Sequence, residues 1–582
     1  MPVAALLDRL ATSRRLFEPV FQHAERAPER PFLILEKSGA THVLTFGALA
    51  ERASRWARAL RARGVGEGEI VAFMLSTHAE LAPAFLGAIV AGAVPSIFPA
   101  ATPKQDPDLF WAAHRALFRR LHTPLILTDR RNAALAAARL PEFAAAIVDL
   151  DGDLPLPPAG QSSGIAAGGE IALLQHSSGT TGLKKGVMLG HRAVLDAVAA
   201  LGGALGLTER DLIASWLPLY HDMGLIACLV LPMLCGLTVV QLDPFEWVLR
   251  PATLLDAIER HRATLCWMPN FAFHHILRTV APDASWDLGA MRAFIDCSEP
   301  CKPETFRRFR ARFGRCGLAP HALQASYALA ENVFGATQTA PGGDPAVVAA
   351  DPSAYAAERR IAAPRPGEPA LEFLSMGPPI PGTRVRILDD AGVELPDRRV
   401  GEIALASPYL FSGYAGLPLP AGKLRDGWYR TGDLGFTAAG ELFVCGRLDD
   451  LLIINGRNIY AHDVEFAVNR HTAVKPGRCV AIGPYNQRTG SASLVVIAET
   501  EAAGTEAGRE LARAVQRVVE AEFGVVPYDV HLTLPGWLVK TTSGKISREA
   551  NAKKYREEGP GGTPVALAGN PGGSGAGADQ QC

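Results

Sequence analysis

The chain has 582 residues, more than one ordinary hydrophobic core accommodates, so its length predicts two or more domains. Its 58 basic and 59 acidic residues balance, which argues against a dedicated nucleic-acid surface. The nine cysteines form no Cys-x-x-Cys pair, so we expect free buried thiols and neither a disulfide framework nor a zinc site.

The N-terminal part alternates between helical and strand patterns. Residues 48–66 carry apolar side chains at helical spacing, and a buried strand over residues 70–75 follows. The apolar face of this helix is formed by Leu49, Ala53, Trp56, Ala57 and Leu60. A second helix is expected over residues 78–92, and further strands over 93–97 and 125–127. The alternation predicts an α/β fold in which parallel sheets are covered by helices.

Residues 176–186 are rich in glycine, hydroxyl and lysine side chains and follow the apolar run 171–174. Glycine lets backbone N–H groups approach a phosphate, while hydroxyls and lysine add donors, so such a loop is typical of a phosphate cradle. The order differs from a Walker A loop, because Gly182 precedes a leucine and Lys185 precedes a glycine. The alternative is a flexible linker, but apolar segments flank the loop. The loop therefore indicates nucleotide binding.

The uncharged stretch over residues 224–242 reaches the length of a membrane span. Pro232 interrupts it and Gly236 divides it, so we expect a buried helix followed by a strand over residues 237–242 and no membrane span. The first nine residues contain no basic leader before a long apolar run, so no secretory signal is expected. Together with the free thiols, this pattern favours a cytoplasmic protein.

Short strands separated by turn residues begin near residue 382 and predict a β-rich subdomain at about 380–448. The strands are expected over residues 384–388, 401–405 and 441–444. A polar break at residues 448–450 precedes a new α/β pattern, so we place a domain boundary there. The predicted domains are a large domain over residues 1–448, a small C-terminal domain over 449–556 and a Gly-, Pro- and Ala-rich disordered tail over 557–582.

Six motifs, in order along residues 20–556, resemble those of the adenylate-forming ligases. This superfamily contains acyl-CoA synthetases, adenylation domains of peptide synthetases and luciferases. The motifs lie in residues 176–186, 216–225, 296–300, 326–332, 429–450 and 540–548. The resemblance implies that the large domain joins a carboxylic acid to AMP and that a mobile α/β C-terminal domain turns about a hinge at Asp449.

The resemblance also implies the residues of an ATP site. The loop at 176–186 would grip the β- and γ-phosphates, and Tyr327 would stack on adenine. Asp433 would accept hydrogen bonds from both ribose hydroxyls, and Arg447 would add a ribose or phosphate contact. Glu331 would hold Mg²⁺, which prefers hard oxygen ligands. The implied ATP-binding residues are Ser177, Ser178, Gly179, Thr180, Thr181, Gly182, Lys185, Ser298, Glu299, Pro300, Tyr327, Asp433 and Arg447.

By the same resemblance, the catalytic residues are Lys545, His221 and Glu331. Lys545 would contact both the substrate carboxylate and the α-phosphate, and His221 would lie at the mouth of the carboxylate pocket, where Gly224 opens room for the acyl chain. Taken alone, His221 has a plainer interpretation as a core histidine that tethers a turn, and Lys545 as a solvated surface lysine. The implied acyl pocket contains His221, Gly224, Asn270 and Phe271.

Residues 268–273, 374–382 and 455–465 look most like segments of fatty acyl-AMP ligases, which pass the acyl group to an acyl carrier protein. The stretch over 339–372 fits the insertion that these enzymes carry, whereas Asp449 departs from them, since they often have lysine at the hinge. We therefore expect ATP-dependent activation of a fatty acid and its transfer to the phosphopantetheine thiol of a carrier protein. The alternatives are an acyl- or aryl-CoA ligase and a catalytically silent binding protein.

Overall fold

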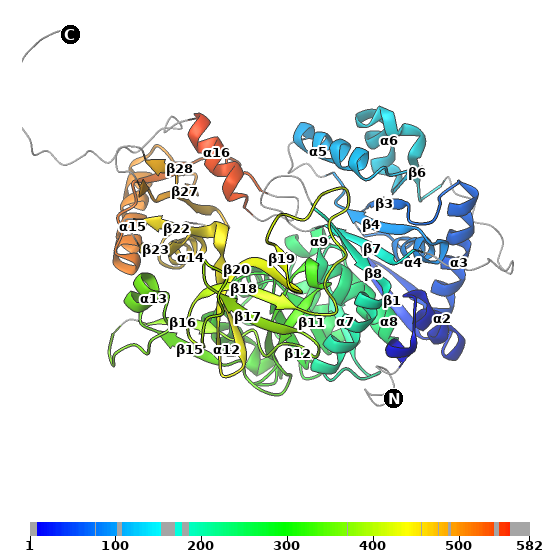
Figure 1. Ribbon diagram of the computed structural model, residues 1–582, viewed down its shortest axis with the longest axis horizontal. Coiled ribbons are helices and arrows are strands. Elements are labelled where there is room, and N and C mark those ends of the chain that lie inside the picture. Colours follow the sequence, from blue (N-terminus) through cyan, green and yellow to red (C-terminus); the bar gives the residue numbers. More distant parts are fainter. Residues whose placement is uncertain are drawn as a thin grey trace, which may run out of the picture. The chain divides into compact units, whose positions relative to one another are not determined.

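The computed structural model describes residues 9–75, 77–101, 107–152, 169–176, 185–368, 370–454, 457–474, 477–486, 491–540 and 546–558. The chain forms two compact units, Met1–Asp449 and Asp450–Cys582 (Figure 1). The larger unit contains sheets of eight, six and five strands, and the smaller unit is built around a three-stranded sheet. Within the described ranges, no helix is both long enough and apolar enough to cross a membrane.

A six-stranded sheet and four helices are formed by residues 46–190 of the larger unit (Figure 1). Their bounds are β3 (Ile70–Met74), β4 (Val94–Phe98), β5 (Leu125–Thr128), β6 (Ile147–Asp149), β7 (Ile171–His176), β8 (Gly186–Gly190), α3 (Phe46–Ala62), α4 (Leu81–Ala91), α5 (Pro107–Arg120) and α6 (Arg130–Arg139). The strand order is β6-β5-β3-β4-β7-β8. Phe73 contacts Phe85 of α4 on one face, with ring centroids 6.2 Å apart, while Phe98 contacts Phe118 of α5 on the other, at 5.2 Å. Helices therefore cover both faces.

Helix α3 forms where its apolar spacing predicts a helix. The Thr45 side chain accepts a hydrogen bond from the Ala48 N–H group and caps the first turn. The five side chains of the predicted apolar face are all buried. The chain leaves the helix through Gly64, whose φ of +80° is accessible to glycine at little cost. The predicted helix and the strands at β3, β4 and β5 are confirmed.

An eight-stranded sheet is the largest sheet of the larger unit, and it takes two strands from the start of the chain and six from residues 212–338. Its strands are β1 (Pro31–Lys37), β2 (Ala40–Thr45), β9 (Leu212–Ser215), β10 (Thr238–Leu242), β11 (Leu265–Met268), β12 (Ala293–Cys297), β13 (Leu323–Ala328) and β14 (Gly335–Gln338). The order is β14-β13-β12-β11-β9-β10-β1-β2. The interior pairs are parallel, whereas β2 and β14 run antiparallel to their neighbours at the two edges.

The predicted parallel pairing holds in the interior of the sheet, and the antiparallel edge strands are an addition to the predicted pattern. Strands β1 and β2 are joined only by Ser38 and Gly39, which both have positive φ, and such a turn reverses the chain. The connection from β13 to β14 spans residues 329–334 and is also short. A parallel neighbour needs a crossover of a dozen or more residues, so these short connections allow only antiparallel pairing.

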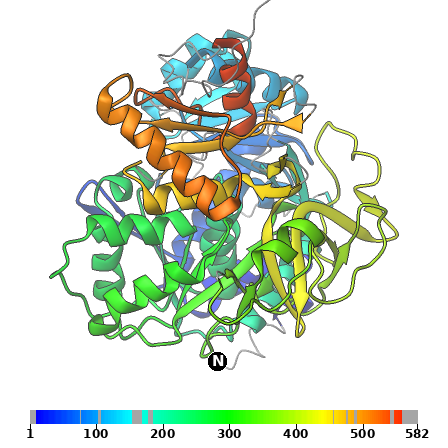
Figure 2. The ribbon, with the colours of Figure 1, turned by 90° about the vertical axis from the view of Figure 1, so that its left-hand side faces the viewer.

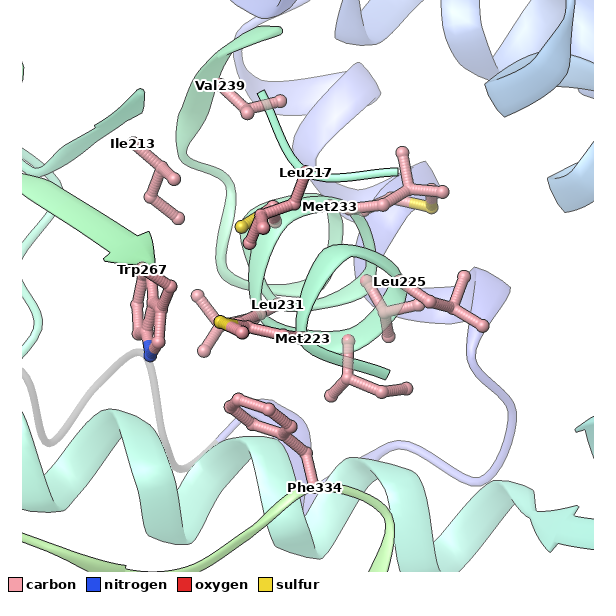
Figure 3. Close-up of a cluster of buried hydrophobic side chains, with 14 of the residues drawn as sticks. Ile213, Leu217, Met223, Leu225, Leu231, Met233, Val239, Trp267 and Phe334 are labelled. Atoms are coloured by element: carbon pink, nitrogen blue, oxygen red, sulfur yellow. The ribbon is translucent and has the colours of Figure 1, made fainter. Parts of the chain in front are cut away.

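Helices cover both faces of the eight-stranded sheet. The remaining helices of this region are α2 (Phe17–Arg26), α7 (His191–Ala204), η2 (Met223–Val230), α8 (Leu231–Cys235), α9 (Pro244–Leu249), α10 (Ala252–His261), α11 (Asn270–Thr279) and α12 (Pro303–Phe313). Phe294 of β12 contacts Phe309 of α12, with ring centroids 5.4 Å apart. Figure 3 shows Ile213 and Trp267, from β9 and β11, facing the coil formed by η2 and α8.

The uncharged stretch over residues 224–242 is a buried helix followed by a strand, as predicted. Its first part, η2, is a π-helix, and the Leu231 N–H group at its end donates to the carbonyl of Ile226, five residues earlier. Helix α8 ends at Gly236, which has a φ of +68°. Strand β10 then lies inside the eight-stranded sheet. Every residue of η2 and α8 is buried, which accounts for the absence of charge.

The strands predicted after residue 382 form a five-stranded antiparallel sheet. Their bounds are β17 (Arg384–Leu388), β18 (Gly401–Ala406), β19 (Leu424–Arg425), β20 (Trp428–Ala438) and β21 (Glu441–Arg447). Figure 2 shows the long strands of this sheet in yellow. The stretch over 339–372 contains β15 (Val347–Ala350), α13 (Pro352–Glu358) and the start of β16 (Leu371–Leu374), and β15 pairs with β16. Its assignment as an insertion stays a prediction.

The smaller unit has its own core. Its elements are β22 (Leu451–Ile454), β23 (Arg457–Tyr460), α14 (Ala461–His471), β24 (Cys479–Ile482), β25 (Tyr485–Asn486), β26 (Ser491–Ala492), β27 (Val495–Glu499), α15 (Glu506–Phe523), β28 (Asp529–Thr533) and α16 (Arg548–Glu558). Strand β27 lies between β24 and β28. Valines of α14 and α15 share one buried apolar cluster with residues of this sheet. Of the predicted tail, residues 557 and 558 end α16, and residues 559–582 lie outside the described ranges.

The described cysteines are free and buried, which confirms the expected free thiols. They are Cys228, Cys235, Cys266, Cys297, Cys301, Cys316, Cys445 and Cys479. Burial raises the pKa of Cys228 and Cys235 to about 12, because the apolar surroundings disfavour a thiolate. These two thiols are therefore packing groups rather than nucleophiles.

Candidate active site

The predicted phosphate loop joins two neighbouring strands of the six-stranded sheet. His176 at the end of β7 pairs with Gly186 at the start of β8. Lys185 is described and partly buried, whereas Ser177, Ser178, Gly179, Thr180, Thr181 and Gly182 lie outside the described residues. The catalytic candidate Lys545 also lies outside them. The roles of these seven residues stay predictions.

Three of the predicted nucleotide-binding residues meet at one place. The Tyr327 hydroxyl donates to Oδ2 of Asp433 at 2.5 Å, although the two residues are 106 positions apart. Nε of Arg447 donates to Oδ1 of the same carboxylate at 3.2 Å. Strand β13 supplies the tyrosine, while β20 and β21, which pair with each other, supply the aspartate and arginine. A carboxylate accepts about four hydrogen bonds, so Asp433 retains capacity for two more donors.

The electrostatics of this group follow from its burial. Burial raises the pKa of the Asp433 carboxyl, and the Arg447 guanidinium and Tyr327 hydroxyl oppose that rise. Burial and the nearby Asp433 charge raise the pKa of Tyr327 well above its usual value, so the phenol stays a donor at neutral pH. The arrangement leaves an acceptor carboxylate flanked by an aromatic ring and a guanidinium, which suits a sugar with two hydroxyls.

A second group forms around Glu331. The Tyr414 hydroxyl donates to Oε1 of Glu331 at 2.8 Å, and the Tyr429 hydroxyl lies 3.2 Å from the Tyr414 hydroxyl. Nζ of Lys185 lies 5.2 Å from the centroid of the Tyr414 ring, on its face. Burial and the Glu331 charge raise the pKa of Tyr414. This group therefore places a carboxylate at the hydroxyl and an ammonium over the ring of one tyrosine.

Glu331 fits a Mg²⁺ ion that is completed by substrate phosphates. Within the described residues, no cluster of three or more His, Cys, Asp or Glu side chains forms a cage for a metal. Oε2 of Glu331 has no hydrogen-bond partner among the described residues. Mg²⁺ typically takes one or two protein carboxylates and fills its octahedron with phosphate oxygens and water, so a single carboxylate with a free oxygen is a suitable donor.

The segment after β12 has an irregular backbone. Ser298 adopts the left-handed region with a φ of +70°, which is uncommon for a residue other than glycine. The Glu299 carboxylate accepts a hydrogen bond from the Phe271 N–H group at 3.0 Å and so stabilises the first turn of α11. The Glu299 side chain therefore has a structural partner, and a contact to a base through Ser298, Glu299 and Pro300 stays a prediction for their backbone.

His221 and Gly224 surround the start of the π-helix η2. The His221 N–H group donates to the carbonyl of Pro218 at 3.2 Å, and Nδ1 of His221 lies 2.6 Å from Oδ1 of Asp222. A Cβ atom on Gly224 would lie 2.3 Å from the same Pro218 carbonyl oxygen. The turn at residues 218–222 is therefore close-packed, and the structure supplies a packing reason for Gly224 in addition to the predicted room for an acyl chain.

The side chains beside η2 form a buried apolar cluster. Figure 3 shows Met223, Leu231, Trp267 and Phe334 in this cluster. Trp267 is fully buried, and its indole N–H group has no partner among the described residues.

Asn270 and Phe271 lie at the start of α11, at the end of β11. The Phe271 ring packs edge-on against Trp216, with centroids 6.0 Å apart, and 46% of Phe271 is exposed. Trp216 in turn stacks on Trp247 at 3.6 Å. No hydrogen bond, ion pair or ring contact of the described residues joins Asn270 or Phe271 to His221 or Gly224. The shared acyl pocket of these four residues stays a prediction.

Tyr414 and Tyr429 were missed by reasoning from the sequence. Tyr414 is 83 positions from Glu331, and no spacing or composition signal links the two. Tyr429 begins the motif that contains Asp433, but its hydroxyl has no predicted role. Asp449, the predicted hinge, is exposed and is the last residue of the larger unit.

Comparisons with known proteins identify the family of the chain. The model of the AMP-binding enzyme family matches residues 20–415. The chain is 32% identical over 561 residues to FadD26 of Mycobacterium marinum, a long-chain-fatty-acid–AMP ligase, covering 90% of this chain and 93% of FadD26. It is 33% identical over 406 residues to JamA of Moorena producens, a medium-chain-fatty-acid–acyl-carrier-protein ligase, covering 66% of this chain and 68% of JamA.

The fold has solved counterparts. A structure from a study of fatty acyl-adenylate ligases from E. coli and L. pneumophila superposes with a TM-score of 0.85 at 26% identity. The alignment covers 94% of this chain and 98% of that chain. The family model, the relative FadD26 and the fold point to the same family. The chain therefore belongs to the AMP-binding enzymes, the adenylate-forming family that its motifs resemble.

Proposed function

We propose that the protein activates a fatty acid with ATP and transfers the acyl group to an acyl carrier protein. An oxygen of the carboxylate attacks the α-phosphorus of ATP, the bond to the bridging oxygen breaks, and pyrophosphate leaves. The product is an acyl-AMP mixed anhydride. The phosphopantetheine thiol of the carrier protein then attacks the acyl carbon, and AMP leaves with the electron pair of the cleaved C–O bond.

The observation that carries this proposal is the meeting of Tyr327, Asp433 and Arg447 in a chain that matches FadD26 over nine tenths of its length. Asp433 would accept from the ribose hydroxyls, and Tyr327 would lie against the base.

The chemical difficulty of the reaction is repulsion between two anions, the carboxylate and the triphosphate. Bound Mg²⁺ would neutralise phosphate charge and polarise the P–O bonds. Glu331 would hold this ion, and Lys185 would bind the phosphates. Lys545 would bind the oxygens at the α-phosphorus, where charge develops. We expect Lys545→Ala to reduce adenylate formation by about 10²–10³-fold while ATP still binds, because it removes one such contact.

Different observations support the proposed acid and the proposed acceptor. The apolar side chains around η2 favour a hydrocarbon chain over a polar acid. JamA, which is named for transfer to a carrier protein, supports a protein-bound thiol as the acceptor. The alternative acceptor is coenzyme A, and the sequence feature that favours it is Asp449, which is the residue typical of CoA ligases at the hinge.

The first experiment tests adenylation. The enzyme is incubated with ATP, Mg²⁺ and a mixed pool of fatty and aromatic acids, and adenylates are identified by mass spectrometry alongside pyrophosphate release. We expect fatty acyl-AMP as the main product. If no acid of a broad panel releases pyrophosphate, the chain is a catalytically silent binding protein and the proposal is wrong.

A matched pair of variants tests the ribose contact. Asp433→Asn keeps the shape of the side chain but removes its charge, and we expect kcat/KM for ATP to fall about 10- to 100-fold, as for loss of a charged hydrogen bond. Asp397→Asn is the control, because Asp397 accepts from Thr437 on the same strand β20 at an exposed position. Equal kcat/KM values for both variants would contradict the assignment of Asp433.

The second experiment tests the acceptor. Purified enzyme that holds bound acyl-AMP is mixed with a phosphopantetheinylated carrier protein or with free coenzyme A. Thioester formation is then followed over time. We expect the carrier protein to be acylated faster at equal thiol concentration. Faster acylation of free coenzyme A would establish the alternative, an acyl-CoA ligase.

A further inference from the structure

The segment that carries Tyr414 is fastened to the strand at the base of the predicted phosphate loop. The Met188 N–H group of β8 donates to the carbonyl of Gly413 at 3.0 Å, and the Ser412 N–H group donates back to the carbonyl of Met188 at 2.9 Å. Two residues after Gly413, the Ala415 N–H group donates to the carbonyl of Gly186 at 2.8 Å. Tyr414 is therefore held on the strand that begins one residue after Lys185.

The same segment holds Glu331 at two points. The Phe411 N–H group donates to the backbone carbonyl of Glu331 at 2.9 Å. The Tyr414 hydroxyl donates to the Glu331 carboxylate at 2.8 Å, and the Tyr429 hydroxyl, 3.2 Å from it, adds a third member to the network. The Phe411 ring packs against both tyrosines. Its centroid lies 4.9 Å from the centroid of the Tyr414 ring and 5.4 Å from that of the Tyr429 ring. Only 5% of Tyr414 is exposed, so the phenol has little freedom to move.

Glu331 needs such a support because its own backbone is irregular. It lies in the short 3-10 turn η4 (Ala330–Asn332) rather than in a long helix or strand. The next residue after this turn, Val333, has φ +62° and ψ −57°, and the Phe334 N–H group donates to the carbonyl of Asn332 at 2.6 Å. This is a γ-turn, a rare conformation for a branched residue, and it persists only where neighbouring contacts hold it. Local structure alone therefore does not fix the direction of the Glu331 side chain.

We propose that Tyr414 is a positioning residue for adenylation, whose hydroxyl orients the Glu331 carboxylate toward the divalent cation while its ring seats the Lys185 ammonium. This inference rests on the proposed function, in which Glu331 and Lys185 bind the metal and the phosphates. In this proposal, the Tyr414 side chain sets the distance between Glu331, which binds the divalent cation, and Lys185, which binds the phosphates. Partners that orient a metal ligand through a hydrogen bond typically change metal affinity by about 10- to 100-fold.

The test compares Tyr414→Phe with a matched control, Tyr409→Phe. Both substitutions remove only a hydroxyl from a tyrosine that is 5% exposed, but the Tyr409 hydroxyl donates to the carbonyl of Pro381 and contacts neither Glu331 nor Lys185. The first readout is the Mg²⁺ concentration for half-maximal acid-dependent pyrophosphate release. We expect it to rise about 10- to 100-fold in Tyr414→Phe, with most of kcat restored at saturating Mg²⁺, and to stay unchanged in Tyr409→Phe.

The second readout does not require catalysis. Binding of Mn²⁺ in the presence of a non-hydrolysable ATP analogue is measured by electron paramagnetic resonance, and Tyr414→Phe should weaken it by a similar factor. If wild-type enzyme releases no pyrophosphate with any acid, the proposed function is wrong, and Mn²⁺ binding still tests Tyr414. A folded Tyr414→Phe variant with wild-type metal dependence in both measurements would overturn the positioning role.

The ring has a separate test. Tyr414→Phe retains an aromatic face for Lys185, whereas Tyr414→Leu removes it. A cation over an aromatic ring contributes about 0.5–2 kcal/mol, so we expect the KM for ATP in Tyr414→Leu to exceed that of Tyr414→Phe by about 2- to 30-fold. Equal KM values in the two folded variants would remove Lys185 from the proposal.

Discussion

Replacement of Gly224 by alanine distinguishes two reasons for a glycine at the start of η2. A Cβ atom at this position would lie 2.3 Å from the Pro218 carbonyl oxygen, 3.0 Å from its carbon and 3.3 Å from Cβ of Leu217. To restore the 3.4 Å of ordinary contact, the carbonyl must retreat by about 1 Å. The Pro218 carbonyl belongs to a partly buried, close-packed turn, so the backbone has little room to give way.

The magnitude follows from the cost of overpacking. Inserting a methyl group into a well-packed core typically destabilises a protein by about 1–3 kcal/mol. The Pro218 carbonyl also accepts the His221 N–H group at 3.2 Å, so its movement displaces the predicted carboxylate-pocket histidine. We therefore expect Gly224→Ala to lower the free energy of unfolding by about 1–3 kcal/mol and to reduce kcat/KM for acids of every chain length.

The assay is urea unfolding followed by tryptophan fluorescence, together with kcat/KM for a series of fatty acids of increasing length. Gly314→Ala is the control. Gly314 has φ −57° and ψ −37°, and a Cβ atom there meets no other atom within 4 Å, so alanine should stabilise the chain by about 0.4–1 kcal/mol. If Gly224 serves only to admit the acyl chain, Gly224→Ala will shorten the longest acid accepted and leave the unfolding midpoint unchanged. That result would refute the packing argument.

Three further substitutions test the structural framework. Burial lowers the pKa of His191 from 6.5 to about 4, so as pH falls below 6.5 the unfolded chain takes up a proton first and stability is lost down to about pH 4. His191→Asn retains an acceptor for the Leu16 N–H group but has no group that titrates. In thermal unfolding, this variant should lose less stability than wild type between pH 7 and pH 4. An equal loss would contradict the burial argument. Arg292→Ala leaves the Asp211 carboxylate, which is 1% exposed, without its cation. The free energy of unfolding in denaturant should fall by about 3–5 kcal/mol. A fall of less than about 1 kcal/mol, as for a surface pair, would contradict this prediction. Glu499 accepts hydrogen bonds from the N–H groups of Gly536 and Leu538. Glu499→Ala leaves these two groups unpaired and should cost about 1–3 kcal/mol of unfolding free energy for each. Hydrogen exchange of the two amides should accelerate, and unchanged protection would contradict this prediction.

Local patterns were sufficient for most elements of the fold. The spacing of Leu49, Trp56 and Leu60 predicts the buried face of α3, and the division at Gly236 predicts a helix followed by β10. Such predictions succeed because periodicity reports which side of a helix or strand is buried. The antiparallel sheet edges were missed, since a two-residue turn such as Ser38-Gly39 reverses the chain without changing the apolar pattern of either strand.

The sequence by itself determined the family and the types of chemical group in the site, because the motifs that contain Tyr327, Glu331 and Asp433 are contiguous and can be matched one by one. Only the tertiary structure decided how these groups support one another. Two examples are the hydrogen bond from Tyr414 to Glu331 and the close approach of Gly224 to Pro218. Both depend on strand order, chain reversals and separations of less than 4 Å. These quantities arise when distant segments pack together, and local residue patterns do not encode them.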